Sequence, residues 1–146
     1  MQQRSTTSAA NPTSATHPPT AAAIPELPED CPPDVERLGR HTWTLLHTLT
    51  ATYPERPTPT DKANARGFVT AFSNTYPCSV CREDFQEWLG EQERQGEVER
   101  ALGGRDLFGR FMCGAHNAVN EKLGKARFDC DGWQRRWVEG PGERCP

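Results

Sequence analysis

The sequence has no long apolar run and no strong excess of charge of either sign. No stretch approaches the roughly 20 apolar residues that a membrane-spanning helix needs, so we expect no membrane span. With 17 Lys and Arg against 20 Asp and Glu, the formal net charge at pH 7 is −3. This balance argues against a nucleic-acid-binding module, which needs a basic face. A basic segment followed by an apolar stretch is also lacking near the first residue, so we expect no secretory signal peptide.

Residues 1–28 are poor in charge and in large apolar side chains. They contain one basic residue, Arg4, no acidic residue before Glu26, and many Ser, Thr, Ala and Pro. Such a composition buries too little apolar surface to offset the entropy of ordering. We therefore interpret 1–28 as a disordered arm that precedes one folded domain at 29–146. A targeting segment is the alternative, because transit peptides are rich in Ser and poor in acidic residues, but a single Arg gives it little support.

The remainder of the chain does not alternate like a strand for long, and its apolar residues recur at helical spacing. The pattern predicts an all-α fold: a four-helix bundle with a short fifth helix. We expect the helices to run from 32–34 to about 53, over about 60–74, from 78 onward, over about 106–123, and over 131–138. A loop is predicted between the third and fourth. The fourth helix carries an apolar stripe made of Phe108, Phe111, Met112, Ala115, Val119 and Leu123.

Six cysteines are far more than a chain of this length ordinarily contains, and they indicate disulfides or a metal site. Cys78 and Cys81 form a Cys-x-x-Cys motif directly after Pro77, which ends one helix so that Cys78 begins the next. A thiol at a helix N-terminus has a lowered pKa because it lies at the positive end of the helix dipole. The motif therefore suits thiol–disulfide exchange. An inert disulfide or half of a metal site fits it equally well.

A polar strip lies beside the apolar stripe of the fourth helix. Its members, together with two ring side chains of the first helix, could face a planar heterocyclic ligand: Cys113, His116, Asn117, Asn120, Trp43 and His47.

The pairing of the cysteines stays open at this point. Cys78, Cys81, Cys113 and His116 also match the ligands of a Cys₃His zinc site. Cys113 could instead pair with Cys130, which would stabilise the fold by about 3 kcal/mol. The two remaining cysteines, Cys31 and Cys145, could pair with each other or across a dimer.

Eight segments together resemble the Erv/ALR family of flavin-linked sulfhydryl oxidases, over about residues 30–145. They are 31–34 (CPPD), 38–48 (LGRHTWTLLHT), 53–55 (YPE), 76–85 (YPCSVCREDF), Cys113, 116–120 (HNAVN), 122–125 (KLGK) and 128–130 (FDC). The resemblance implies a disulfide-stapled bundle that binds FAD at its mouth, holds no metal and pairs as a homodimer.

The resemblance also implies roles for individual residues. Cys78 would be attacked by the substrate thiol, and Cys81 would pass electrons to the flavin. Cys113 and Cys130 would form a structural disulfide, and Cys31 and Cys145 occupy positions that join two subunits in a short form of the family. His47 and His116 are expected to hydrogen-bond the flavin rather than act as general bases. Flavin contacts would fall on Gly39, Arg40, Trp43, His47, Tyr76, Cys113, His116, Asn117, Val119, Asn120, Lys122, Lys125, Arg136 and Trp137.

The implied function is FAD-dependent oxidation of thiols in protein substrates, with oxygen or cytochrome c as the electron acceptor. The family favours the mitochondrial intermembrane space, with an oxidised import receptor as partner; the endoplasmic reticulum or cytosol is the alternative. The chain has no second Cys-x-x-Cys, which many members use as a shuttle. Substrate thiols are therefore expected to reach Cys78 directly, unless the chain is a shortened form. The competing hypothesis is a non-catalytic interaction module stapled by zinc or disulfides.

Overall fold

The computed structural model describes residues 30–140 and 142. The arm expected at 1–28 and Cys145 lie outside the described residues. The chain divides into two compact units, Met1–Cys31 and Pro32–Pro146. The fold described below is that of the second unit.

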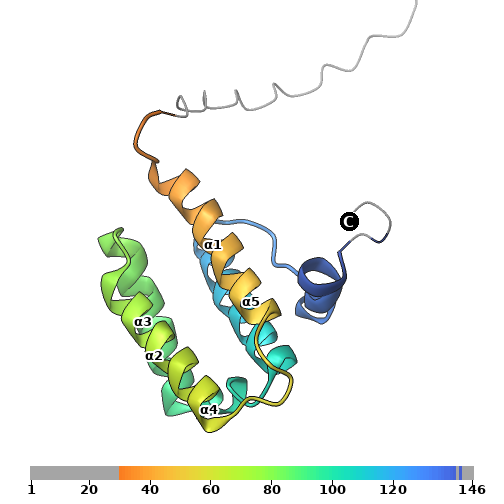
Figure 1. The fold of residues 1–146 in the computed structure, drawn as a ribbon. Coiled ribbons are helices and arrows are strands. Elements are labelled where there is room, and N and C mark those ends of the chain that lie inside the picture. The colour runs from red at the N-terminus through yellow and green to blue at the C-terminus, as the bar shows by residue number, and fades with distance from the viewer. Residues whose placement is uncertain (1–29, 141, 143–146) are drawn as a thin grey trace, which may run out of the picture. The chain divides into compact units, whose positions relative to one another are not determined.

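The described part of the second unit is helical and contains no strand (Figure 1). Its elements are α1 (Val35–Ala51), α2 (Pro59–Thr75), α3 (Ser79–Arg94), α4 (Glu97–Ala101), α5 (Arg105–Lys122), the 3₁₀ turn η1 (Cys130–Gly132) and the wider helical turn η2 (Arg135–Glu139). The predicted all-α class is confirmed, and the four long helices lie close to their predicted bounds. The predicted fifth helix is divided into η1 and η2.

Three of the four long helices begin where the sequence offers a side chain to cap them, and α5, with Gly104 at its N-cap, begins without one. The carboxylate of Asp34 accepts a hydrogen bond from the backbone N–H of Arg37 at 2.7 Å, at the start of α1. Thr58 and Asp61 bond each other's backbone N–H groups at the start of α2, which forms a capping box. At the start of α3 the cap is the sulfur of Cys78. Local capping contacts therefore define the starts of α1, α2 and α3.

The prediction of a loop between the third and fourth helices was wrong, because α4 lies there. Gly96, with φ of 73°, occupies its N-cap, and no side chain caps the helix. Five residues are too few for an apolar period to show in the sequence. Burial of Val98 and Ala101 stabilises this turn, so tertiary packing rather than local signal decides its structure.

The core lies between two helix pairs. Figure 1 shows α1 beside α5 and α2 beside α3, and α4 packs on both α3 and α5. Leu123 was expected in the core but is 61% exposed, because α5 ends at Lys122 and Gly124, with φ of 66°, turns the chain away. The apolar core consists of Leu46, Tyr53, Ala65, Val69, Phe85, Leu89, Val98, Ala101, Leu102, Phe108, Met112 and Ala115.

The C-terminal segment docks on α5 through one close approach. Trp133 is 1% exposed, and a Cβ atom added to Gly109 would lie 2.0 Å from two atoms of its indole ring. No other residue fits at position 109 while the indole stays in place. Gly109 therefore allows the segment that contains η1 and η2 to pack against the bundle.

We expect Gly109→Ala to destabilise the protein by about 1–3 kcal/mol, because the new methyl group forces the indole of Trp133 out of its site. Gly67→Ala is the matched control. Its Cβ atom would meet nothing within 4 Å, so that replacement should stabilise α2 by roughly 0.5–1 kcal/mol. Urea unfolding of the two variants measures both effects. Equal stability of Gly109→Ala and the unmodified protein would contradict the packing argument.

Candidate active site

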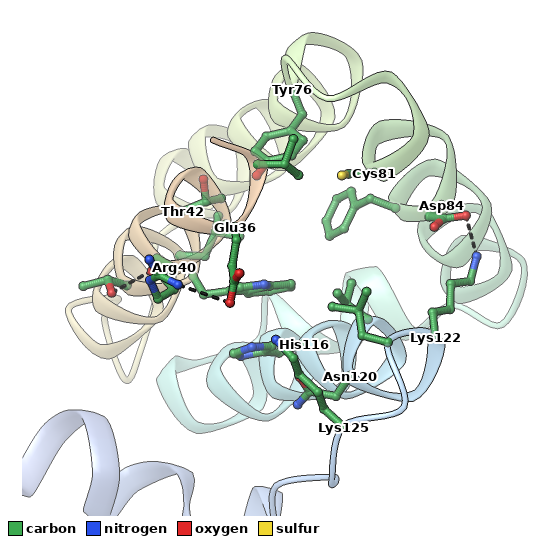
Figure 2. A pocket seen from close by; sticks show the side chains of 18 of the residues that line it. Glu36, Arg40, Thr42, Tyr76, Cys81, Asp84, His116, Asn120, Lys122 and Lys125 are labelled. Atoms are coloured by element: carbon green, nitrogen blue, oxygen red, sulfur yellow. Dashed lines mark hydrogen bonds and ion pairs between the residues drawn. The ribbon is translucent and has the colours of Figure 1, made fainter. Parts of the chain in front are cut away.

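A cleft of about 870 Å³ opens between α1, the beginning of α3 and the C-terminal half of α5 (Figure 2). Its volume lies within the range of about 300–1,000 Å³ that is usual for small-molecule and cofactor sites. Twenty-one residues line it, and most of the lining surface is apolar. Trp137 of η2 contributes to one wall.

The disulfide of the Cys-x-x-Cys motif lies at the edge of this cleft. Cys78 and Cys81 are bonded to each other, and the Cys78 sulfur accepts a hydrogen bond from the backbone N–H of Cys81 at 3.3 Å. Cys81 lines the cleft, whereas Cys78 is not among the lining residues. Figure 2 places Cys81 between Tyr76 and Asp84 on the cleft wall. One sulfur of the pair thus faces the cleft, and the other caps the helix.

Rings of tryptophan and histidine form a column beside the cleft. Trp43 stacks on His116, with ring centroids 4.1 Å apart and planes 5° from parallel. His116 Nδ1 lies 3.0 Å from His47 Nε2, in hydrogen-bond contact, and His47 stacks on Trp137 at 4.6 Å. His47 is 3% exposed and lies behind the cleft, so it supports His116 rather than lining the cleft.

Both imidazoles are held in their uncharged form. Burial lowers the pKa of His47 to about 4, and the electrostatic influence of His116 and Arg136 acts in the same direction. Burial also lowers the pKa of His116, and the neighbouring Lys125 adds to this effect. At pH 7 one imidazole donates and the other accepts in the bond between them. The column therefore offers flat, polar, uncharged surfaces.

Charged side chains surround the mouth of the cleft. Lys122 Nζ lies 2.5 Å from Asp84 Oδ1, which connects α5 to α3, and Glu87 lies 3.9 Å from the same nitrogen (Figure 2). Arg40 Nη1 on α1 lies 3.3 Å from Glu36 Oε1. Lys125 also lines the cleft and has no ion pair with any carboxylate in the described part of the chain. The mouth therefore offers cationic groups suited to an anionic ligand.

A second disulfide, between Cys113 and Cys130, lies away from the cleft lining. Asn117, 4% exposed, reinforces it. Its amide nitrogen donates to the Phe128 carbonyl, and its amide oxygen accepts from the Phe128 N–H, both at 2.8 Å. These contacts fasten the chain after α5 to the bundle. The cysteines of the zinc hypothesis, Cys78, Cys81 and Cys113, are bonded in disulfides and do not offer thiolates to a metal.

The structure divides the predicted cofactor residues into two groups. His47, Cys113, Asn117 and Arg136 do not line the cleft: the first three have the partners described above, and the Arg136 guanidinium lies 5.0 Å from the centre of the Trp137 ring. Those that line the cleft are Gly39, Arg40, Trp43, Tyr76, His116, Val119, Asn120, Lys122, Lys125 and Trp137.

Several lining residues escaped the sequence reasoning. Asp84 and Phe85 lie three and four positions after Cys81 on the same helix, so helical spacing alone could have placed them on its face. The others carry no comparable signal: Val35, Glu36, Thr42, Thr44, Leu46, Phe72, Val80 and Leu123. Among the described residues, Cys31 has no disulfide partner, and the pairing expected with Cys145 falls outside them.

Comparison with known proteins decides the family. Residues 40–138 match the model of the Erv1 / Alr family. The chain belongs to this family. It is 47% identical over 109 residues to the mitochondrial FAD-linked sulfhydryl oxidase ERV1 of Saccharomyces cerevisiae, covering 75% of this chain and 54% of that protein. It is 41% identical over 102 residues to the FAD-linked sulfhydryl oxidase ERV1 of Arabidopsis thaliana, covering 70% and 50%. The chain thus spans about half the length of these curated relatives.

Solved structures of this Erv1 / Alr family agree with the fold. The crystal structure of the yeast Erv1 core has a TM-score of 0.71 and 41% identity, covering 83% of this chain and 98% of that one. The FAD-binding domain of Erv1 from Saccharomyces cerevisiae has a TM-score of 0.67 and 44% identity, covering 75% and 98%. The disulfide-stapled helical bundle predicted from the sequence is therefore the family fold.

The buried histidines make stability depend on pH. Because the pKa of His47 falls from 6.5 when unfolded to about 4 when folded, the unfolded chain binds more protons between these values. Stability is therefore lost as the pH falls from about 6.5 toward 4, with a limiting slope of about 1.4 kcal/mol per pH unit for one proton. Urea unfolding of the cofactor-free protein at pH 7, 6 and 5 should show this loss.

The variant His47→Gln is the comparison, since it removes the titrating ring and leaves the carboxylates that also titrate at low pH. Its stability should change less between pH 7 and 5 than that of the unmodified protein. Parallel pH profiles for the two proteins would contradict the assignment of the effect to His47.

Proposed function

We propose that this protein is an FAD-dependent thiol oxidase that forms disulfides in protein substrates. One observation carries the proposal: the Cys-x-x-Cys disulfide at a helix N-terminus presents one of its sulfurs, that of Cys81, to a cleft of cofactor size. The relatives named above, called FAD-linked sulfhydryl oxidases, support the same activity. The proposal assigns the oxidase domain to residues 29–146 and treats 1–28 as an arm outside it.

The cleft suits FAD in shape and in charge. Trp43, His116 and Tyr76 offer flat ring faces for the ring systems of the cofactor, and Arg40 and Lys125 offer positive charge for its diphosphate. His47 Nδ1, buried and without a hydrogen-bond partner among the described residues, supplies an unused polar atom in the supporting layer. When bound, FAD would supply the two-electron acceptor that amino-acid side chains lack.

The two cysteines divide the thiol chemistry between them. A substrate thiolate attacks the Cys78 sulfur and displaces Cys81 as a thiolate. A second substrate thiol then attacks the substrate sulfur of this mixed disulfide and displaces Cys78. The Cys78 thiolate is a good leaving group because it caps α3 and accepts the Cys81 N–H. The substrate leaves with a disulfide, and Cys81, on the cleft side, is placed to pass the two electrons onward.

The finer assignments belong to the same proposal. We place the protein in the mitochondrial intermembrane space, supported by the Saccharomyces cerevisiae relative, which is named mitochondrial. Its partners there would be thiol-rich imported proteins and their oxidised import receptor, with cytochrome c or oxygen as electron acceptor. A homodimer joined through Cys31 and Cys145 completes the proposal. Within the described residues, no helix is long and apolar enough to cross a membrane.

Replacing Cys81 by Ser should leave FAD bound but abolish reduction of the flavin by a thiol, because the cleft-facing sulfur is lost. Absorbance spectra of the purified variant, recorded before and after anaerobic addition of dithiothreitol, measure both properties. Cys31→Ser serves as the control, and dithiothreitol should reduce its flavin at the same rate as the flavin of the unmodified protein. A bleached flavin in Cys81→Ser would refute the assignment, and a colourless, zinc-loaded unmodified protein would refute the proposed function.

The electron acceptor can be identified by comparing two assays of the same enzyme. Thiol consumption is followed with oxygen alone, and then anaerobically with oxidised cytochrome c, whose reduction is recorded by absorbance. We expect turnover in both assays. Failure of the anaerobic assay would remove cytochrome c from the proposal and leave oxygen.

A further inference from the structure

Arg82 follows the redox pair directly and is tied back to the segment in front of it. It lies in the first turns of α3, and its Nη1 donates a hydrogen bond to the carbonyl oxygen of Tyr76 at 3.2 Å. This bond spans Pro77 to Cys81, so it encloses the whole Cys-x-x-Cys motif. The side chain is half-buried. The guanidinium is therefore held beside the backbone that leads into Cys78.

A cation is unfavourable at this end of a helix. The N-terminus of α3 already carries the positive end of its dipole, and its first turn contains no acidic residue. While Cys78 and Cys81 are joined in a disulfide, neither sulfur carries a charge that Arg82 could balance. After reduction, a thiolate of Cys78 at the N-cap would be favoured by the dipole and by the guanidinium together.

The carboxylates nearest in sequence do not neutralise Arg82. Asp84 is bound by Lys122 from α5, and Glu83 is exposed to solvent. Arg82 itself forms no ion pair with any carboxylate among residues 30–140. Other elements that line the cleft also contribute charged or titratable groups. Glu36 and Arg40 of α1 pair with each other. Tyr76 lies at the end of α2, and His116 and Lys125 come from α5 and the turn after it. Of the charged groups named, Arg82 and Lys125 have no carboxylate partner among the described residues, and Glu83 is the one carboxylate without a cation.

We propose that Arg82 is a positioning residue that stabilises the reduced Cys78–Cys81 pair through its charge and so makes the disulfide a stronger oxidant of substrate thiols. The proposal rests on the proposed thiol-oxidase function. In the step concerned, two substrate thiols lose two electrons and form one disulfide, and the Cys78–Cys81 bond gains these electrons. One proton stays on the reduced pair, and the other is released to solvent because Cys78 remains a thiolate.

Three replacements separate charge from hydrogen bonding. Arg82→Met removes both, Arg82→Gln removes the charge but keeps an N–H donor, and Arg82→Lys keeps the charge. Arg94→Met is the matched control, since it removes a cation from the other end of α3, where Arg94 pairs with Glu91. The full-length, FAD-loaded proteins are equilibrated anaerobically with reduced and oxidised glutathione, and the disulfide fraction is read by alkylation and mass spectrometry.

We expect Arg82→Met and Arg82→Gln to shift the equilibrium about tenfold toward the disulfide, and to raise the midpoint pH of Cys78 alkylation by about one unit. Arg82→Lys and Arg94→Met should stay near the unmodified protein. A wild-type value for Arg82→Gln, or a value for Arg82→Lys equal to that of Arg82→Met, would overturn the proposal. Because this equilibrium needs no turnover, it reports on Arg82 even if the unmodified protein fails to oxidise substrate thiols, a failure that would count against the proposed function alone.

Discussion

The contact between α1 and α5 creates the candidate site, and a column of rings maintains it. Trp43 from α1 stacks on His116 from α5, His47 from α1 bonds His116 from behind, and Trp137 covers His47. Each ring is held in place by a neighbour from a different element. Because burial keeps the imidazoles uncharged, this arrangement avoids the cost of two adjacent cations in the interior. Without this contact the cleft would lose one wall, and the disulfide would face solvent.

The polar residues of α5, expected from the sequence to form one strip, serve two separate surfaces. His116 and Asn120 line the cleft, whereas Cys113 and Asn117 fasten the chain around Phe128 and Cys130. Each pair is separated by four residues and so lies along one line of the helix, and the two lines differ by about one residue's rotation, roughly 100°. A chemical difference between the two lines is not visible in the sequence, because amides, imidazoles and thiols suit a ligand or a structural contact equally well.

The parts of the fold that local chemistry controls could be predicted, and the parts that depend on distant contacts could not. Pro77 before Cys78 and the apolar period of the long helices identify their bounds and the position of the redox motif. The existence of α4, the exposure of Leu123 and the meeting of Asp84 with Lys122 depend on tertiary packing. The cleft falls between these cases, since the family resemblance supplied about half of its lining residues and helical geometry could have added Asp84 and Phe85.

The two disulfides differ in the solvent access of their sulfurs, and this difference matters for the proposed exchange of thiols. Cys78 and Cys81 are both partly open to solvent, whereas in the second disulfide Cys130 is partly open and Cys113 is 2% exposed. Exchange requires a thiolate to approach a sulfur in line with its bond, so the rate falls steeply when that sulfur is covered. A thiolate can therefore approach either sulfur of the Cys78–Cys81 bond, but only the Cys130 sulfur of the Cys113–Cys130 bond. Burial of one sulfur thus halves the number of sulfurs open to attack in the Cys113–Cys130 bond, although the two bonds are chemically identical.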